Sequence, residues 1–216
     1  MVSILKKETL KSKERLSGLF LLITALLFVI LTFIAMRFYP SSYSFTEDTF
    51  SSLGQINVNG ADNSISRALL IIACTLVAVA LVPFWLIMPI LFKENKKDIY
   101  LSRCGSLFGL FAAPFLPFIA IIPLDWGYEI HMIPTDIFFF CMAVAILLYS
   151  IAIFFNSDYQ NIFGVIFLVF SIITFLYIYR FFDIIRPIMQ RIIVYSFMLW
   201  AFFQVAKIWK ITKPES

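Results

Sequence analysis

The fold is decided by the stretch GLFLLITALLFVILTFIAMR, residues 18–37. Between Gly18 and Arg37 it contains no charged residue and no proline. A transmembrane helix needs about 20 consecutive, mostly apolar residues, so this stretch is long enough to span a bilayer. The basic segment that precedes it, KKETLKSKER at 6–15, resembles the start of a signal peptide. The apolar run is too long for a signal peptide and no small-residue cleavage site follows, so we expect a membrane span over 17–37.

Five further stretches of similar character follow, and the composition agrees with them. The chain is 62% hydrophobic and 14% charged, whereas a soluble domain is about 45–50% apolar and about 25% charged. We therefore predict an all-α, multi-pass protein of the cell membrane, a bundle of six transmembrane helices with no soluble domain. The expected spans are 17–37, 68–92, 105–124, 133–155, 162–182 and 192–209.

Basic residues are distributed unequally between the two faces of this predicted bundle. Five arginines fall on one face: Arg37, Arg67, Arg180, Arg186 and Arg191. All ten lysines, with Arg15 and Arg103, fall on the other. Because cytoplasmic loops carry the excess of Lys and Arg, we expect both termini in the cytoplasm. The chain then divides into a basic arm (1–16), one transmembrane domain (17–209) and a tail (210–216). The net charge of +4 mostly reflects this asymmetry, and we expect no nucleic-acid partner.

The longest segment outside the spans is the predicted outer loop, 38–66. We expect a short helix from Thr46 to Leu53 with Thr46 as its N-cap, and a turn at NVNG, residues 57–60. The apolar side chains of this loop suggest a lid lying in the membrane interface. Prolines should kink the second and third spans, because proline frees a backbone carbonyl: they are Pro83, Pro89, Pro114, Pro117 and Pro123.

Recognisable catalytic and cofactor motifs are few. Cys74, Cys104 and Cys141 lie in or beside apolar runs without a CxxC spacing, so we expect neither a disulfide framework nor a cysteine metal site. A single histidine gives a weak zinc signal, because zinc takes three or four protein ligands. We expect no metal and no cofactor.

One polar cluster stands out, in IIPLDWGYEIHMIPTDIFFF at 121–140. Asp125, Glu129 and the only histidine, His131, fall on the outer side, and Asp136 lies about one turn inside the fourth span. Ionisable groups in a membrane are costly and indicate a function or a specific partner. The outer basic residues are all arginine, whose planar fork suits carboxylate and phosphate groups, and Asp183 shares a helical face with Arg180.

Three interpretations of this cluster remain open. In the first, Arg67, Arg180 and Arg191 pair with Asp136 and Asp183 and tie the outer helix ends together. In the second, these three arginines and Asp183 bind an anionic ligand, such as a lipid phosphate. In the third, His131 is a general base or metal ligand oriented by Asp125 or Asp136.

The function that we expect is non-enzymatic and lipid-interacting, through the Arg/Asp/His cluster at the outer face. The first alternative is a membrane-embedded lipid hydrolase or transferase that uses His131, and the second is a small transporter. Membrane lipids are the expected partners, together with either a second copy of the chain or another membrane protein.

A family resemblance rests on a series of short motifs. YSFTEDTFSSLG (43–54) is followed by NSISRALL (63–70), and IPLD (122–125) by His131 and Asp136. This order resembles the six-span prokaryotic membrane proteins that share domain of unknown function 998, and is similar to the wider Frag/DRAM/Sfk-type family, some members of which are linked to lipid handling. The resemblance points to these residues: Ser52, Leu53, Gly54, Asn63, Asp125 and His131. The family pattern often reads SDLG where this chain has Ser51-Ser52, so an acid is missing there. Ceramidase-like hydrolases use several histidines around a metal, and one histidine argues against them.

Overall fold

The computed structural model describes residues 2–212, and side chains from residue 12 onward. Within this part of the chain, six helices are long and apolar enough to cross a membrane. They are Ser12–Arg37, Ser64–Leu91, Lys96–Ile121, Tyr128–Ile153, Asn161–Ile178 and Asp183–Ile211. The prediction of an all-α bundle with six membrane spans is confirmed. The location of the termini in the cytoplasm stays a prediction.

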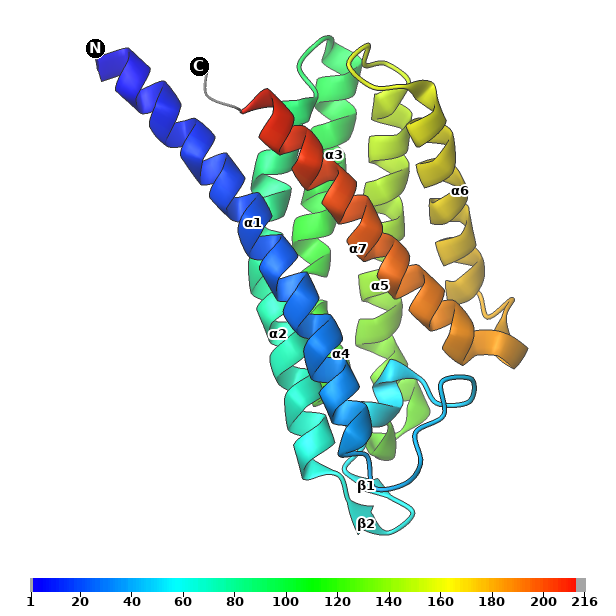
Figure 1. The fold of residues 1–216 in the computed structure, drawn as a ribbon. Helices are drawn as coiled ribbons and strands as arrows, with labels where there is room; N and C mark the ends of the chain where they lie inside the picture. Colours follow the sequence, from blue (N-terminus) through cyan, green and yellow to red (C-terminus); the bar gives the residue numbers. More distant parts are fainter. Residues whose placement is uncertain (1, 213–216) are drawn as a thin grey trace.

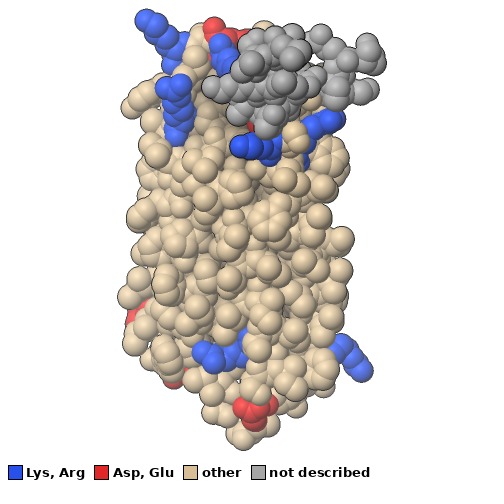
Figure 2. All heavy atoms as spheres, turned by 90° about the vertical axis from the view of Figure 1, so that its left-hand side faces the viewer, with Lys and Arg blue, Asp and Glu red and all other residues tan. Residues whose placement is uncertain are grey.

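Seven α-helices build these spans, because the third span is divided in two. They are α1 (Val2–Arg37), α2 (Ser64–Ile87), α3 (Lys96–Ala112), α4 (Phe115–Ile121), α5 (Tyr128–Ile153), α6 (Asn161–Ile178) and α7 (Arg186–Ile211). The start of α1 and the end of α7 lie at one end of the bundle, which we call the termini end; the hairpin of β1 (Asn57–Val58) and β2 (Ala61–Asp62) marks the other, the cap end (Figure 1). Charged side chains gather at these two ends and leave an apolar band between them (Figure 2).

Prolines act mostly at helix ends. Pro114 separates α3 from α4, and Pro89 lies in the 3-10 turn η2 (Met88–Leu91), with which the second span ends. In contrast, α2 continues through Pro83. The irregularity predicted for spans two and three is therefore a tightened final turn in span two and a break between α3 and α4 in span three.

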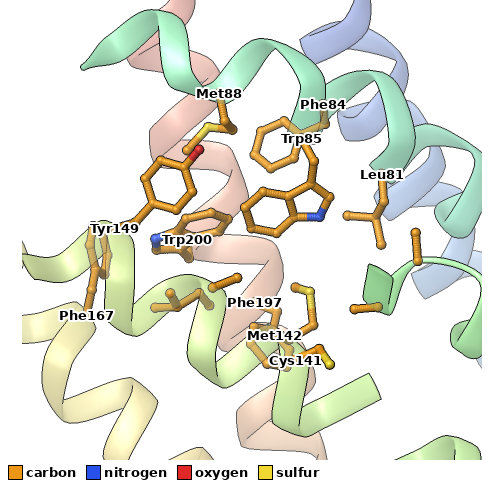
Figure 3. Packing of buried hydrophobic residues seen from close by; sticks show 14 of the residues in the cluster. Leu81, Phe84, Trp85, Met88, Cys141, Met142, Tyr149, Phe167, Phe197 and Trp200 are labelled. Carbon is orange, nitrogen blue, oxygen red and sulfur yellow. The ribbon is translucent and has the colours of Figure 1, made fainter. Parts of the chain in front are cut away.

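Two glycines of α3 allow the middle of the bundle to pack closely. A Cβ atom on Gly109 would lie 2.2 Å from the Trp85 ring, and one on Gly105 would lie 2.9 Å from the Tyr149 ring. The indole of Trp85 is fully buried and lies with Trp200 at 5.4 Å between ring centroids (Figure 3). Without an aqueous driving force between helices, close approach at small residues is what holds membrane helices together.

The loop between α1 and α2 folds onto the cap end. The predicted helix from Thr46 to Leu53 is wrong: the structure has a 3-10 helix, η1 (Phe50–Gly54), capped by Thr49. Thr49 and Ser52 bond each other's backbone N–H groups, both at 3.2 Å, and this reciprocal cap starts the helix later than Thr46. The predicted turn at NVNG is confirmed, as the connection between β1 and β2. Asn59 and Gly60 both have positive φ, 52° and 83°, as a tight hairpin turn requires.

Candidate functional site

The cap, which we define as residues 41–62, is inserted into the bundle by η1. Leu53 is fully buried and Phe50 is nearly so. The Phe50 N–H donates to Oε1 of Gln190 on α7 at 2.8 Å, and the Ile56 N–H donates to Oδ2 of Asp125 at 2.7 Å. The cap is therefore attached to two separate parts of the bundle.

A second set of bonds joins the cap to the start of α2. The side-chain amide of Asn63 donates to the carbonyls of Leu53 and Gln55, at 3.1 and 2.9 Å. The Ser66 hydroxyl also donates to Leu53 O, at 3.2 Å. The carbonyls at the end of η1 thus find partners in the N-cap residue and the first turn of α2, so that these buried backbone groups are satisfied.

His131 lies beneath this cap, with only 1% of its surface exposed. Its Nδ1 is 2.7 Å from the carbonyl oxygen of Ile122 and its Nε2 is 2.9 Å from the Ser51 hydroxyl. Because a carbonyl only accepts, Nδ1 carries the proton, and Nε2 of the neutral ring accepts from Ser51. His131 is therefore held in one tautomer, and both ring nitrogens are occupied by groups other than the candidate acids.

The two acidic candidates stand apart from the imidazole. Asp125 accepts the bond from Ile56 N–H described above. Asp136 is half-buried on α5, and no side-chain hydrogen bond of Asp136 is found within residues 12–212. The three candidate catalytic residues are close in sequence, but the structure does not link His131 to either acid by a hydrogen bond.

Arg191 is the most buried of the candidate arginines, at 6% exposure. Its Nη2 donates to the Tyr43 hydroxyl at 2.7 Å and to Asp48 O at 2.8 Å, and its Nη1 donates to Pro187 O at 2.9 Å. The guanidinium also lies over the rings of Tyr43, Phe45 and Phe50, at 4.8–5.5 Å. No carboxylate of the described residues comes within 4.0 Å of it, so this buried positive charge is held by dipoles and aromatic faces alone.

The remaining arginines lie separately around the cap end of the bundle, at what we call its rim. Arg67 donates to Ile121 O at 3.1 Å, and its Nε has no partner among the residues described. Arg180 has a positive φ of 59° and lies over the Tyr128 ring at 5.1 Å. Asp183 pairs with Arg186 at 3.0 Å, whereas the sequence had suggested Arg180. In the described part of the chain this is the one ion pair, so Arg67, Arg180 and Arg191 are not neutralised there by Asp136 or Asp183.

Two tyrosines of the cap region remain protonated. Burial, followed by the nearby Asp48 and Asp125 carboxylates, raises the pKa of Tyr39 to about 12. Burial also raises the pKa of Tyr43, although the Arg191 charge opposes it. Both phenols can therefore donate hydrogen bonds, Tyr39 to the Gln55 side chain at 3.2 Å and Tyr43 to Thr49 O at 2.9 Å.

An apolar cavity of about 110 Å³ lies beneath the cap, bordered by α1, α2, α4, α5, α7 and η1. Along α7 its lining extends from Gln190 to Ala201, about 16 Å at the 1.5 Å rise of a helix. Ser51 and Gln190 are its polar residues at the cap end. At the inner end, Leu81, Met142, Phe197 and Trp200 surround it (Figure 3). Its apolar lining, which follows α7 for three turns, suits a hydrocarbon chain.

The less buried side of this cavity, which we call its opening, lies between α1 and α7. Five of the seven half-exposed residues of the lining are on these two helices: Leu22, Ala25, Val194, Met198 and Ala201. The two helices also diverge from the termini end toward the cap end (Figure 1). Arg191 adjoins the cavity at its cap end, because its guanidinium lies over Phe50, which lines the cavity.

The termini end carries a second polar network, which the sequence analysis missed. Asp98 is fully buried and accepts bonds from Asn95 N–H at 3.1 Å and from the Asn156 side chain at 3.1 Å. Glu94 accepts from the backbone N–H of Ser157 at 2.6 Å and from its hydroxyl. These Ser157 bonds lower the pKa of Glu94. The α2–α3 and α5–α6 loops are thereby joined.

No metal centre is found in the described residues: no three His, Cys, Asp or Glu side chains there are arranged to hold an ion. The three cysteines are free.

Comparison with known proteins places the chain in a family. A family described as "Protein of unknown function (DUF998)" matches residues 22–206, and the chain belongs to it. The resemblance to this family is confirmed, while the similarity to Frag/DRAM/Sfk-type proteins stays a prediction. No curated protein and no solved structure matches the chain. Residues that carried the resemblance, namely Leu53, Asn63, Asp125 and His131, meet in and around the cap.

Proposed function

We propose that this multi-pass membrane protein is non-enzymatic and binds a lipid at its cap end. The observation that carries the proposal is the apolar cavity beneath the cap, beside the buried charge of Arg191, which has no carboxylate within 4.0 Å in the described residues. A buried charge is costly unless it is paired. A phosphate headgroup at the opening would supply the counter-charge, and its acyl chain would fill the cavity.

Two arginines at the rim add to this charge. Arg67 and Arg180 also lack a carboxylate within 4.0 Å among the described residues, and guanidinium groups bind phosphate oxygens in pairs of hydrogen bonds. In this proposal the rim arginines attract and orient the anionic headgroup. Asp183 acts indirectly, because it holds Arg186.

The acyl-chain part is tested by filling the cavity. Ala25→Leu and Ala201→Leu add side-chain volume from α1 and α7, and the control Leu199→Phe changes an exposed position of α7 that does not line the cavity. Lipid retained on the purified protein is measured by native mass spectrometry. We expect both filling variants to lose lipid that the wild type and Leu199→Phe retain; equal retention in all four overturns the proposal.

The headgroup part is tested by neutralising the rim. We expect Arg67→Gln with Arg180→Gln to reduce the preference for phosphatidylglycerol over phosphatidylcholine. Arg37→Gln, which removes one positive charge from the end of α1, is the control. If the double variant binds phosphatidylglycerol as the wild type does, these arginines do not form the site.

A specific contact favours a second candidate, a membrane-embedded lipid hydrolase or transferase. Ser51 borders the apolar cavity and donates to Nε2 of His131 at 2.9 Å, while Ile122 O fixes the ring. This is the arrangement of a serine nucleophile, its general base and an orienting group. Ser51 Oγ would attack a lipid ester carbonyl and pass its proton to Nε2, and His131 would return that proton to the leaving alcohol.

Covalent labelling distinguishes this candidate from a purely structural Ser51–His131 contact. A fluorophosphonate probe reacts with a serine that a base activates. If the candidate is right, the wild type is labelled at Ser51, whereas Ser51→Ala and His131→Gln are not labelled. An unlabelled wild type, together with lipid retention as proposed above, excludes the hydrolase and leaves the lipid-binding function intact.

A further inference from the structure

A second cavity lies at the opposite end of the bundle, between α6 and α7. Its volume is about 250 Å³, and it is lined by residues of the α5–α6 loop and of both helices. The two helices approach each other near η4 (Asp183–Ile185) and separate toward the termini end (Figure 1). We refer to it as the α6–α7 cavity.

Positive charge stands at the rim of this cavity. Lys207 and Lys210 are one turn apart on the same face of α7 and both line it, an arrangement in which like charges repel. The Lys207 ammonium donates to Asp158 O and lies 4.4 Å from the Tyr159 ring centroid, which fixes its position at the rim. An ammonium has three donors, so further bonds remain available. Asp158 also lines the cavity. Its negative charge offsets one of the two positive charges of the lysines.

Two other groups at the rim are suited to an anion. Gln204 is 1% exposed and lines the cavity. Its Oε1 accepts from the Tyr159 hydroxyl at 2.9 Å, and no bond from its amide nitrogen is found within the described chain. Gln160, directly before the 18-residue helix α6, makes no capping bond with its side chain, and the helix N-terminus adds a partial positive charge.

The floor of the cavity is apolar and continues toward the lipid. Phe163 and Phe167 of α6 and Phe203 of α7 form it, with Phe163 6.3 Å from Phe167 and 6.0 Å from Phe203 between ring centroids. Phe167 is buried and Phe203 is 42% exposed. A ligand that fits has an anionic head and a hydrocarbon stem, with the stem leaving between the helices.

We propose that the α6–α7 cavity binds an anionic phospholipid of the leaflet at the termini end, with its phosphate at Lys207, Lys210 and the Gln204 amide. This site is separate from the cap end and does not rest on the function proposed above. A free phosphate ion shares the headgroup chemistry but makes no use of the three phenylalanines.

The experiment measures binding of dioleoyl phosphatidylglycerol to the full chain in detergent, by native mass spectrometry. Each basic residue near a membrane surface contributes about 1 kcal/mol toward anionic lipid, so Lys207→Ala with Lys210→Ala should weaken binding about thirtyfold. Lys93→Ala with Lys96→Ala is the matched control, because it removes the same charge from exposed positions outside the cavity. Gln204→Leu should weaken binding with the net charge unchanged.

Each outcome supports or overturns the proposal. The proposal is supported if phosphatidylglycerol binding is weakened in the Lys207/Lys210 and Gln204 variants but not in the Lys93/Lys96 control, and if neither inorganic phosphate nor phosphatidylcholine competes. Equal loss in both lysine double variants shows nonspecific surface attraction and overturns it. Competition by inorganic phosphate at the affinity of the lipid assigns the cavity to a free anion, and also overturns it. Lys210→Glu, a change at an exposed position, repeats the test if the double variant fails to fold. Neither lysine contacts the cap, so failure here leaves lipid binding at the cap end untouched.

Discussion

The close packing of α3 against Trp85 predicts that Gly109→Ala destabilises the bundle. The new Cβ atom would lie 2.2 Å from two indole carbons and 2.7 Å from a third. Ordinary carbon contacts are about 3.5–4.0 Å, so Trp85 or α3 must move by roughly 1.3 Å. The indole has no room for this shift, because it is fully buried and packed against Phe84 and Trp200.

Overpacking of this kind costs about 1–3 kcal/mol of unfolding free energy, and we expect Gly109→Ala to fall in that range. The assay is reversible unfolding in mixed detergent micelles, followed by tryptophan fluorescence. Gly18→Ala is the control, since its Cβ would lie 2.8 Å from the nearest Val205 carbon, a smaller overlap than the 2.2 Å approach at Gly109. We expect it to cost less.

A double-mutant cycle identifies the cause. Trp85→Leu removes the indole carbons that the new methyl group meets, so the loss in Gly109→Ala/Trp85→Leu should be smaller than the sum of the two single losses. If Gly109→Ala unfolds at the wild-type denaturant concentration, or if the two losses simply add, the close packing at Gly109 is not what holds α3 in place.

Three further predictions concern the two bundle ends. His131→Leu leaves the Ser51 hydroxyl and a carbonyl without partners and should cost about 1–3 kcal/mol, with faster proteolysis in the cap; an unchanged cleavage rate would contradict the contact. The pKa of Glu94 is lowered by Ser157, so its stabilisation is present above the ordinary carboxyl pKa and is lost as pH falls through the lowered one; the protection of the Ser157 amide against hydrogen exchange, relative to an unstructured peptide at the same pH, should fall in acid, and Glu94→Gln should remove this dependence. The raised pKa of Tyr39, about 12, means that its stabilisation is lost as pH rises from about 10 to about 12; Tyr39→Phe should abolish this step in a base-unfolding curve, and a curve identical to wild type would contradict it.

The fold followed from the sequence because membrane spans have a local signature. Each apolar run gave a helix, and NVNG gave a hairpin turn through two residues that tolerate positive φ. The helix ends differ from the predicted span ends because hydropathy marks the membrane core and not the helix. The second span, for example, was expected from residue 68, whereas α2 starts at Ser64 with a polar first turn that satisfies the cap.

The site was less predictable, because its contacts join distant segments. His131 and Ser51 are 80 residues apart, and Phe50 and Gln190 are 140 apart, so no local pattern signals either pair. Two local features, a helix cap and a close helix contact, could have been predicted from the sequence. NKKD at 95–98 has the spacing of a capping box, which the structure confirms with Asn95 and Asp98. GSLFG at 105–109 has the spacing of close helix contacts.

The preference for arginine at the cap end has a physical explanation in the geometry. Arg191 uses two nitrogens for three bonds while its flat face meets three aromatic rings. Arg186 combines an ion pair with Asp183 and a position over the Tyr177 ring, and Arg180 lies over Tyr128. A lysine has one compact, strongly hydrated charge and cannot provide a planar fork and a flat face together. Arginine is therefore favoured where a charge is held by carbonyls and rings at the cap end of the bundle.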